Sequence, residues 1–433
     1  MSSADVSCFD FVTPSGNRPL RLEEGVRLVL AAASAPTPTE LVDLMQAQGR
    51  ILAETQISPI AVPPARNSAM DGYAILSTDL NHLEAWQLVG ESLAGHPWTG
   101  PLRSGQAVMI TTGACLPSGA DTVVMQEMCE RVEDQLIIRF QESVQPGQHI
   151  REAGEDIALG SAVLYAGQRI GPVEAGLLAS IGIEKVKVHQ ALKVALFSTG
   201  DEVSAPGEPL TAGAIYDSNR YSLAAVLQAL GCEVMDLGIL PDHPQAIHAA
   251  LTVARSKARL VITSGGVSVG EADHIRSVLN RLGQTGFWQL AVRPGRPFAF
   301  GDLGSEPGQE PCLFAALPGN PVAALVTFML ILQPLIRRLQ GETDWVGLTW
   351  SAKVTERMKS RLGRSDFHRG IYSLNAEGVL EVRSTGAQGS GILTSMHQGN
   401  CLIRIPEETA SLAPGDKASI YPFSGWLPGY PAL

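Results

Sequence analysis

Carboxylates, glycines and arginines recur in five short segments of this sequence, each directly after an apolar run that predicts a β-strand. The segments are 198–202 (STGDE), Asp242, 263–273 (TSGGVSVGEAD), 293–297 (RPGRP) and 317–321 (LPGNP). Glu202, Asp242 and Asp273 are hard oxygen donors, of the kind that Mg²⁺ uses when it shares its shell with phosphate and water. Arg293 and Arg296 carry planar donors that suit an oxyanion. These residue types predict a site for an anionic substrate, with Glu202, Asp242 and Asp273 as candidate metal ligands.

The elements around these segments predict how they come together. Strand candidates at 193–197, 233–237, 259–263, 287–292, 298–300 and 313–317 are separated by helical stretches, among them one that Ser218 can cap and one that opens at Asp242 and Pro244. A last helix is expected over 321–339. Strands alternating with helices indicate βαβ units and a mostly parallel, Rossmann-like sheet. Ligands of such sheets bind outside the carboxyl ends of the strands, so we expect the five segments to share one edge.

Two of the segments are suited to holding an anion by their backbone. Gly265 and Gly266 have no Cβ, so the chain can turn sharply there and direct successive N–H groups at a ligand. A helix beginning near Ala272 would add the positive end of its dipole. The candidate substrate-binding residues of these segments are Ser264, Gly265, Gly266, Ser268, Pro318, Gly319 and Asn320, together with Arg296.

Simpler interpretations exist for each segment alone. Gly, Pro, Asp and Asn after strands are common turn residues, and RPGRP is compatible with a plain type II turn. Asp242 and Asp273 also suit the first turn of a helix, where carboxylates accept free N–H groups. The glycine pair matches neither of the common phosphate-loop patterns. Function is favoured because several such segments fall on the same predicted edge.

The remainder of the chain predicts further units. Two helical stretches are expected between 20 and 50, the second beginning at Thr37–Pro38, and short apolar runs from 55 to 144 (86–89, 107–110, 122–125 and 135–140) indicate a small β-rich domain. Alternating segments at 380–383, 401–405 and 418–421 indicate a C-terminal β-barrel-like domain. The fold class is therefore α/β multidomain. The expected domains are 20–54 with 145–177 (a discontinuous, helical or mixed linking domain), 55–144 (β-rich), 178–340 (α/β) and 341–428 (C-terminal β).

Composition excludes several classes of protein. Among 433 residues, 43 acidic against 32 basic side chains give a net charge of −11, which argues against a nucleic-acid-binding surface. The six cysteines form no C-x-x-C pair, so neither a zinc ribbon nor a disulfide scaffold is expected. No basic, apolar leader opens the chain, and the apolar run 322–332 is shorter than the about 20 residues of a membrane span. We expect a cytoplasmic protein without a membrane segment.

Taken in order, the motifs of this chain resemble those of the MoeA family, the molybdopterin molybdenumtransferases related to the E domain of gephyrin. The matching segments are 68–74 (SAMDGYA), 112–114 (TGA), 151–157 (REAGEDI), 198–202, 217–219 (DSN), 263–273, 293–301 (RPGRPFAFG), 317–324 (LPGNPVAA), 363–370 (GRSDFHRG) and 387–390 (AQGS). They cover about residues 20 to 425. So many ordered motifs make the resemblance specific.

The resemblance implies an activity and a set of site residues. The reaction would insert molybdate into adenylylated molybdopterin with Mg²⁺ and release AMP, in a homodimer whose cleft lies between the α/β domain of one subunit and parts of the other. By position, Glu202, Asp242 and Asp273 match acidic cleft residues, Asp71, Thr112 and Asp156 match polar residues of the N-terminal half, and Arg293, Arg369 and Ser390 match residues associated with anion binding. A molybdopterin adenylyltransferase is a candidate partner.

One departure from the family concerns charge. Members often carry Lys where this chain has Arg293 and Arg296, and Arg at these positions keeps the positive charge. At a third position where members often carry Lys, this chain has Gln289, so the positive charge is lost.

Two other functions compete with molybdate insertion: adenylylation of molybdopterin, one step earlier, and a non-enzymatic dimeric scaffold. The N-terminal β unit and the C-terminal domain favour the insertion reaction.

Overall fold

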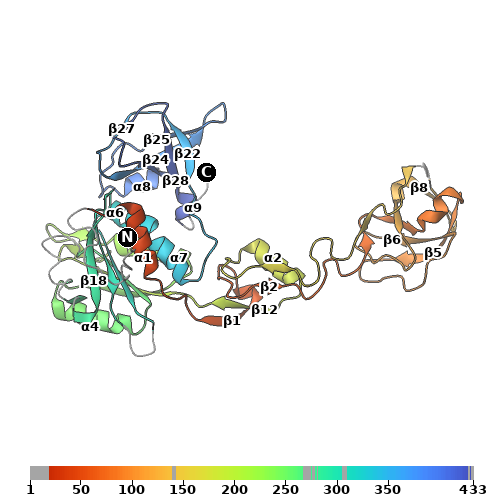
Figure 1. Ribbon diagram of the computed structural model, residues 1–433, viewed down its shortest axis with the longest axis horizontal. Coiled ribbons are helices and arrows are strands. Elements are labelled where there is room, and N and C mark those ends of the chain that lie inside the picture. Colours follow the sequence, from red (N-terminus) through yellow and green to blue (C-terminus); the bar gives the residue numbers. More distant parts are fainter. Residues whose placement is uncertain are drawn as a thin grey trace, which may run out of the picture.

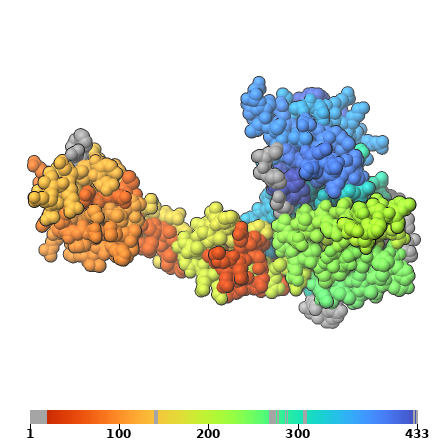
Figure 2. All heavy atoms as spheres, turned by 180° about the vertical axis from the view of Figure 1, so that it is seen from behind, coloured from red at the N-terminus to blue at the C-terminus, as the bar shows by residue number. Residues whose placement is uncertain are grey.

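The chain forms an elongated molecule in which a small β-rich part stands away from the rest (Figure 1). The computed structural model describes residues 19–138, 143–266, 275, 278, 279, 281–304, 310–427 and 430. A narrow middle part joins the β-rich part to a larger body, in which an α/β part and a C-terminal β part lie against each other (Figures 1 and 2). The fold is therefore a mixed α/β multidomain fold, as expected.

The β-rich part is a six-stranded sheet with the order β7-β4-β6-β5-β9-β8. Its strands are β4 (Gly72–Ile75), β5 (Trp86–Ser92), β6 (Gln106–Ile110), β7 (Thr122–Met125), β8 (Cys129–Val132) and β9 (Gln135–Ile138), with the 3₁₀ turns η2 (Ser77–Asn81) and η3 (Gln126–Met128). Four of the strands were expected from their apolar runs. Gly72 is required for packing, because a Cβ there would lie 2.0 Å from the Val124 carbonyl oxygen.

The middle part is built from three short antiparallel pairs and one helix. β1 (Thr39–Asp43) pairs with β12 (Lys185–His189), β2 (Gln56–Ile57) with β11 (Ala162–Leu164) and β3 (Asn67–Ser68) with β10 (Ile150–Arg151), beside the turn η1 (Leu44–Gln46) and the helix α2 (Pro172–Ser180). The helix expected from Thr37–Pro38 is wrong. The segment is the strand β1, since pairing with the buried Val186 and Val188 of β12 outweighs the local capping pattern.

The α/β part has a mixed sheet with the order β16-β13-β17-β21-β20-β18. Its strands are β13 (Lys193–Thr199), β16 (Glu233–Leu240), β17 (Leu260–Ser264), β18 (Gln284–Gln289), β20 (Pro297–Asp302) and β21 (Leu313–Leu317), and the short pair β14 (Val203–Ser204) and β15 (Ile215–Tyr216) lies beside it. The first four strands in the order run parallel, and β20 and β18 are antiparallel at one edge. Every residue of β17 is buried, which is typical of a strand covered on both faces.

Helices cover both faces of this sheet. The helices α1 (Leu22–Ala31), α3 (Asn219–Ala229), α6 (Pro321–Thr327) and α7 (Gln333–Leu339) contribute to one core, and α4 (Pro244–Arg255) contributes to the other. The expected helix over 321–339 is present with a π-helical turn over Phe328–Leu332, just before Pro334, whose missing N–H cannot continue the regular ladder. This helix is long and apolar enough to span a membrane, yet 89% of its most apolar window is buried inside the protein.

The C-terminal part is a small closed barrel. Its strands β22 (Trp350–Val354), β24 (Ser365–Leu374), β25 (Leu380–Ser384), β26 (Cys401–Ile405) and β28 (Lys417–Pro422) pair in a ring, because β26 pairs with both β28 and β24. The pair β23 (Met358–Lys359) and β27 (Ser411–Leu412) and the helices α8 (Thr394–Gln398) and α9 (Phe423–Trp426) complete it. β19 (Val292–Arg293), from the α/β part, joins the ring by pairing with β24.

Candidate functional site

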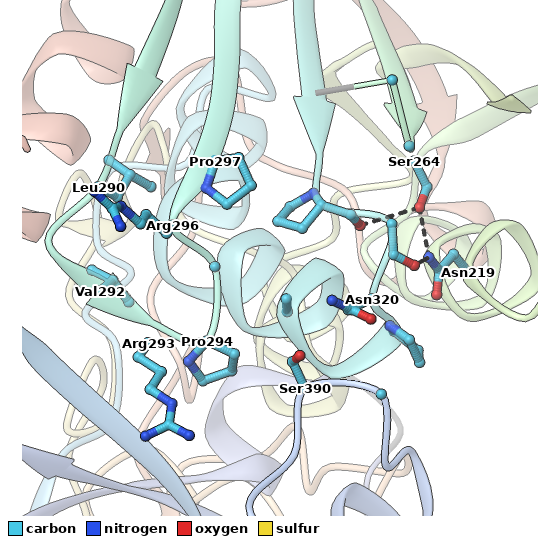
Figure 3. A pocket seen from close by; sticks show the side chains of 18 of the residues that line it. Asn219, Ser264, Leu290, Val292, Arg293, Pro294, Arg296, Pro297, Asn320 and Ser390 are labelled. Carbon is cyan, nitrogen blue, oxygen red and sulfur yellow. Dashed lines mark hydrogen bonds between the residues drawn. The ribbon is translucent and has the colours of Figure 1, made fainter. Parts of the chain in front are cut away.

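A cavity of about 990 Å³ lies where the α/β part meets the C-terminal part. Its wall is formed by residues from the ends of β13, β17 and β21, from the start of α3, from the RPGRP segment, and from two loops of the C-terminal part. In Figure 3, Arg293 and Ser390 lie toward the C-terminal strands, and Ser264 and Asn219 lie across the cavity from them. The cavity therefore draws on both parts of the body.

The sheet explains why these segments meet. β13, β17 and β21 are parallel neighbours, so the residues that follow them emerge at the same edge. The structure places ten of the predicted site residues on the cavity wall: Glu202, Ser264, Gly265, Gly266, Arg293, Arg296, Pro318, Gly319, Asn320 and Ser390. Their chemical roles stay predictions.

Other predicted site residues lie elsewhere. Asp242 is not on the wall; it follows β16, the outermost strand on that side of the sheet. Ser268 and Asp273 lie outside the described residues. Asp71 and Thr112 flank β4 and β6 in the β-rich part, at the far end of the molecule from β18 (Figure 1). Of the predicted acidic residues that the structure describes, Glu202 lies on the wall of this cavity and Asp71, Asp156 and Asp242 do not.

Asp71 and Thr112 form one local unit despite their separation in sequence. The Asp71 carboxylate accepts hydrogen bonds from the Thr112 backbone N–H, at 2.7 Å, and from its hydroxyl, at 2.8 Å. These bonds hold the pKa of the exposed Asp71 carboxyl below its usual value. Asp156 is exposed and forms a backbone hydrogen bond to Val62. Asp71 is therefore an ionised, oriented carboxylate on an open surface.

The glycine pair of the TSGG segment is held tightly but differs from the expected anion cradle. Gly265 and Gly266 have φ values of +96° and +69°, a region that favours glycine. A Cβ on Gly265 would lie 2.7 Å from the Thr199 carbonyl oxygen. The Gly265 N–H donates to the Leu317 carbonyl at 3.1 Å, so it is not available to a ligand. The expectation of two successive free N–H groups is therefore wrong for Gly265.

Guanidinium groups gather on the side of the cavity near the barrel. The pairing of β19 with β24 places Arg293 beside the buried Asp366, with 3.9 Å between the Arg293 and Asp366 side chains. Arg364, also on the wall, donates to Asp366 at 2.8 Å. Burial raises the pKa of Asp366, but the His368 ring at 3.9 Å, the hydrogen bond from Arg364 and the charges of Arg364 and Arg293 outweigh burial, and the pKa is lowered. One ionised carboxylate thus serves several cations.

Arg369 lies directly behind the cavity wall. Its side chain is 1% exposed and donates to Ser395 Oγ at 3.0 Å and to the Gly389 carbonyl at 3.2 Å. Its backbone N–H donates to the side chain of Gln388, a wall residue two positions before Ser390 in the same loop. Among the described residues no carboxylate pairs with it, and burial, together with the charge of Arg293, lowers the pKa of Arg369 to about 10. Arg369 is a buried cation without a counter-anion.

Arg296 has a defined partner. Its Nη2 donates to Gln289 Oε1 at 2.8 Å, so the residue that lacks the charge common in the family holds a neighbouring guanidinium in place. Arg361, Arg364 and Gln388 also line the cavity, although none of them was among the predicted site residues; Gln388 falls within the AQGS motif. Arg364 falls within the GRSDFHRG motif, which was the available signal for it.

Two carboxylates lie on the cavity wall, and they differ in availability. Asp217 is 4% exposed and is committed to Arg220, whose Nε lies at 2.9 Å. The Glu202 carboxylate has no hydrogen bond or ion pair within the described part of the chain, whereas its backbone carbonyl accepts the Ile215 N–H at 2.8 Å, and the residue lines the cavity between β13 and β14. Among the described residues, no group of three or more His, Cys, Asp or Glu side chains could hold a metal ion by itself. A cation here would rely on substrate oxygens as well.

The fold and the cavity define a multidomain α/β protein with an arginine-lined cavity between two of its parts, and comparisons with known proteins identify its family. Residues 20–182 match the MoeA N-terminal region (domain I and II), 195–338 a probable molybdopterin binding domain, and 351–423 the MoeA C-terminal region (domain IV). A molybdopterin molybdenumtransferase of Haemophilus influenzae is 45% identical over 94% of this chain and 100% of its own length. The chain belongs to the MoeA family.

Further relatives support this assignment. Gephyrin of Dictyostelium discoideum is 32% identical over 91% of this chain and 61% of its own length. The crystal structure of a molybdopterin biosynthesis MoeA protein from Pyrococcus horikoshii has a TM-score of 0.80 at 28% identity, and it covers 94% of this chain and 100% of that one. The similarity therefore extends over every part of the fold.

Proposed function

We propose that this protein is a molybdopterin molybdenumtransferase, which inserts molybdate into adenylylated molybdopterin and releases AMP. The observation that carries the proposal is the cavity with Arg293 on its wall and the uncompensated Arg369 behind it. Molybdate and the substrate phosphates are anions, whereas the chain has a net charge of −11. Local guanidinium groups allow such an acidic protein to hold them.

The wall residues receive roles by their chemistry. Ser264, Gly265, Gly266, Pro318, Gly319 and Asn320, with Ser268 of the same segment, would bind the molybdopterin part, and Arg293, Arg296, Arg369 and Ser390 would hold molybdate and phosphate oxygens. The Arg369 guanidinium would act through the 388–390 loop or reach its ligand after a small movement of that loop, because it lies just behind it. This division keeps the oxyanions on the barrel side of the cavity.

Mg²⁺ fits the available donors. Magnesium in such sites is held by one or two carboxylates and completes its shell with substrate phosphate and water, and Glu202 is a free carboxylate on the wall. Glu202, Asp242 and Asp273 are the proposed ligands, with Glu202 the one that faces the cavity. When bound, the ion would neutralise charge on the phosphate link.

The protein contributes to the reaction by positioning the reactants and by stabilising charge electrostatically. An oxygen of molybdate, or water, would attack the adenylyl phosphorus, and the molybdopterin phosphate would leave. Where water attacks, AMP is formed directly. Where molybdate attacks, AMP leaves with the attacking oxygen when the two thiols of molybdopterin bind the metal, and a second molybdate oxygen leaves as water with the two thiol protons. Arg293 would stabilise the charge that develops on the oxygens, since it is half-exposed to the cavity and near a single shared carboxylate. The dithiolate of molybdopterin binds the metal, so the protein needs no nucleophile of its own.

We extend the proposal to a homodimer. Asp71 and Thr112 lie in the β-rich part, at the far end of the chain from its own cavity, and Asp156 is not on the wall of that cavity. All three would complete the cavity of a second subunit. Large apolar side chains are exposed on the middle part, where a partner would cover them: Leu41 at 65%, Met45 at 95% and Val173 at 69%. Mixing inactive Asp71→Ala subunits with inactive Glu202→Ala subunits should restore activity at one of the two cavities of the mixed dimer.

The finer organisation follows from the same proposal. Residues 178–340 would form a Rossmann-like molybdopterin-binding domain, 341–428 the C-terminal domain, 55–144 the β-rich domain, and 20–54 with 145–177 the linking domain. The enzyme would work in the cytoplasm and receive its substrate from a molybdopterin adenylyltransferase.

Incubation with adenylylated molybdopterin, Mg²⁺ and molybdate, followed by measurement of AMP, tests the proposal. AMP release that depends on molybdate and is lost in Arg293→Ala supports it. ATP-dependent adenylylation of molybdopterin would favour the adenylyltransferase alternative, and absence of both reactions in a dimeric, folded protein would favour the scaffold.

A further inference from the structure

The side-chain amide of Asn219 joins two loops of the cavity wall. Asn219 is the first residue of α3 and is 9% exposed. Its Nδ2 donates to Ser264 Oγ and to the Gly319 carbonyl, at 2.6 Å each (Figure 3). Ser264 Oγ lies 3.4 Å from the Pro318 carbonyl, to which it donates. One buried amide therefore links the residues that follow β17 to those that follow β21.

The orientation of this amide is fixed by its neighbours. A backbone carbonyl can only accept, so the nitrogen of Asn219 must face Gly319. The start of α3 is itself anchored, because the Asp217 carboxylate accepts the Arg220 backbone N–H at 3.1 Å and pairs with the Arg220 guanidinium. Ser218, which was expected to cap this helix, makes no capping bond with its side chain. The Asn219 amide is thus attached to a buried helix start that Asp217 and Arg220 hold in place.

Packing alone does not explain the residue. The Oδ1 atom of Asn219 is buried and has no hydrogen-bond partner within the described residues, and an acceptor left in that state costs about 1–3 kcal/mol. Ser198 Oγ and Thr199 Oγ1, on the adjacent end of β13, are buried and unpartnered as well. All three residues line the cavity. An arrangement selected only for stability would not concentrate such atoms at one wall.

We propose that Asn219 is a positioning residue, which holds the Gly265–Gly266 turn and the Pro318–Asn320 loop at the separation that the substrate requires. The proposal rests on the proposed function of the cavity, and it adds a residue with no role there so far. Asn219 acts through Ser264 and Gly319 and is assigned no contact with the reacting atoms. The two loops lie close together, since a Cβ on Gly319 would be 3.8 Å from the Gly265 Cα. A small shift of one loop therefore changes the shape of the wall.

Two substitutions separate the hydrogen bonds of Asn219 from the space that its side chain fills. Asn219→Asp keeps the size of the side chain but replaces the donating nitrogen by an oxygen, which repels the Gly319 carbonyl. Asn219→Ala removes both hydrogen bonds. Asn81→Asp makes the same chemical change at an exposed site in the β-rich part and is the matched control. Because misplacement by about 1 Å can cost about 100-fold in rate, we expect kcat for AMP release to fall by roughly 10- to 100-fold in both Asn219 variants.

The experiment combines kinetics with hydrogen exchange on the full-length protein. Both Asn219 variants should lower kcat more than they raise KM, and exchange should increase in peptides that cover 264–266 and 318–320 but not in the C-terminal barrel. Asn81→Asp should change neither. If Asn219→Ala fails to fold, Asn219→Asp, which keeps the size of the side chain, carries the test alone and is measured in the same way.

The outcomes are distinct. Unchanged kcat and unchanged exchange in the two loops would overturn the proposal, and so would a lower melting temperature with full activity of the folded fraction. If the wild-type protein releases no AMP, the proposed function fails. Exchange in the two loops would then still decide whether Asn219 positions them.

Discussion

Substitution of Glu342 should strongly lower the stability of this protein, because its buried carboxylate joins the middle part to the α/β part. Its carboxylate accepts hydrogen bonds from Arg169 at 2.7 and 3.1 Å and from Arg337 at 2.7 and 2.9 Å. The Glu342 side chain is 4% exposed, Arg337 is 11% exposed and Arg169 is 26% exposed. Glu342→Gln therefore removes the charge that both guanidinium groups share, and of the two only Arg337 keeps a nearby carboxylate, Asp344.

The magnitude follows from this burial. Removal of one partner of a buried ion pair costs about 3–5 kcal/mol, and we expect the lower end, about 3 kcal/mol, because Arg169 is partly exposed to solvent. For a cooperative unit of about 150–250 residues this corresponds to a decrease in melting temperature of roughly 6–12 °C. Glu152→Gln is the matched control. Glu152 pairs with Arg66 at the surface, where an ion pair contributes about 1 kcal/mol or less.

The pH dependence of this difference gives a second measurement. Burial raises the pKa of Glu342, but Arg169 and Arg337 outweigh it, and the folded-state pKa is lowered below the ordinary value of about 4.3. The stabilisation is therefore fully present above about pH 4.3 and is lost as the pH falls through the folded-state pKa. Calorimetry should show wild type and Glu342→Gln far apart at pH 7 and converging as the pH falls through the lowered folded-state pKa of Glu342. Equal melting temperatures at pH 7, or a gap that is independent of pH, would refute the reasoning.

Three further predictions concern other parts of the chain. Gly72→Ala should destabilise the β-rich part by about 1–3 kcal/mol, because the added methyl group would overlap the Val124 carbonyl; faster proteolysis within 55–138 would show it, and wild-type resistance would contradict it. At pH 8, iodoacetamide should modify the exposed Cys115 before Cys232, since burial raises the pKa of Cys232 to about 12. Mass spectrometry of tryptic peptides shows the order of labelling, and early labelling of Cys232 would contradict its burial. Arg293→Ala should weaken molybdate binding by about tenfold or more in a titration, whereas unchanged affinity would remove Arg293 from the anion site.

Much of the body could be predicted from sequence because local pattern and tertiary structure agree there. The apolar runs of β13, β17 and β21 form buried parallel strands, and the residues that follow them share one cavity. The strand order across the sheet could not be read in the same way. It places β16 at the edge, so Asp242 lies off the cavity wall although its own loop has the expected composition.

Where long-range contacts decide the structure, the sequence pattern was misleading or incomplete. Thr37–Pro38 carries a helix-start pattern, yet pairing with β12 makes the next residues a strand. The Gly265 N–H was expected to face a ligand, but it donates a hydrogen bond to the carbonyl of Leu317 at the end of β21. The pairing of Arg296 with Gln289 and the burial of Arg369 likewise depend on partners that only the folded chain brings near.

The location of bound molybdenum tests the proposed site most directly. Crystals of the protein with AMP and molybdate can be measured at the molybdenum absorption edge, where the anomalous signal locates the metal without prior assumptions. We expect a peak inside the cavity, within reach of the Arg293 guanidinium and Ser390. A contradicting result would be a peak that lies only outside the cavity and whose occupancy increases with the molybdate concentration. The cavity would then not be the site of molybdate insertion.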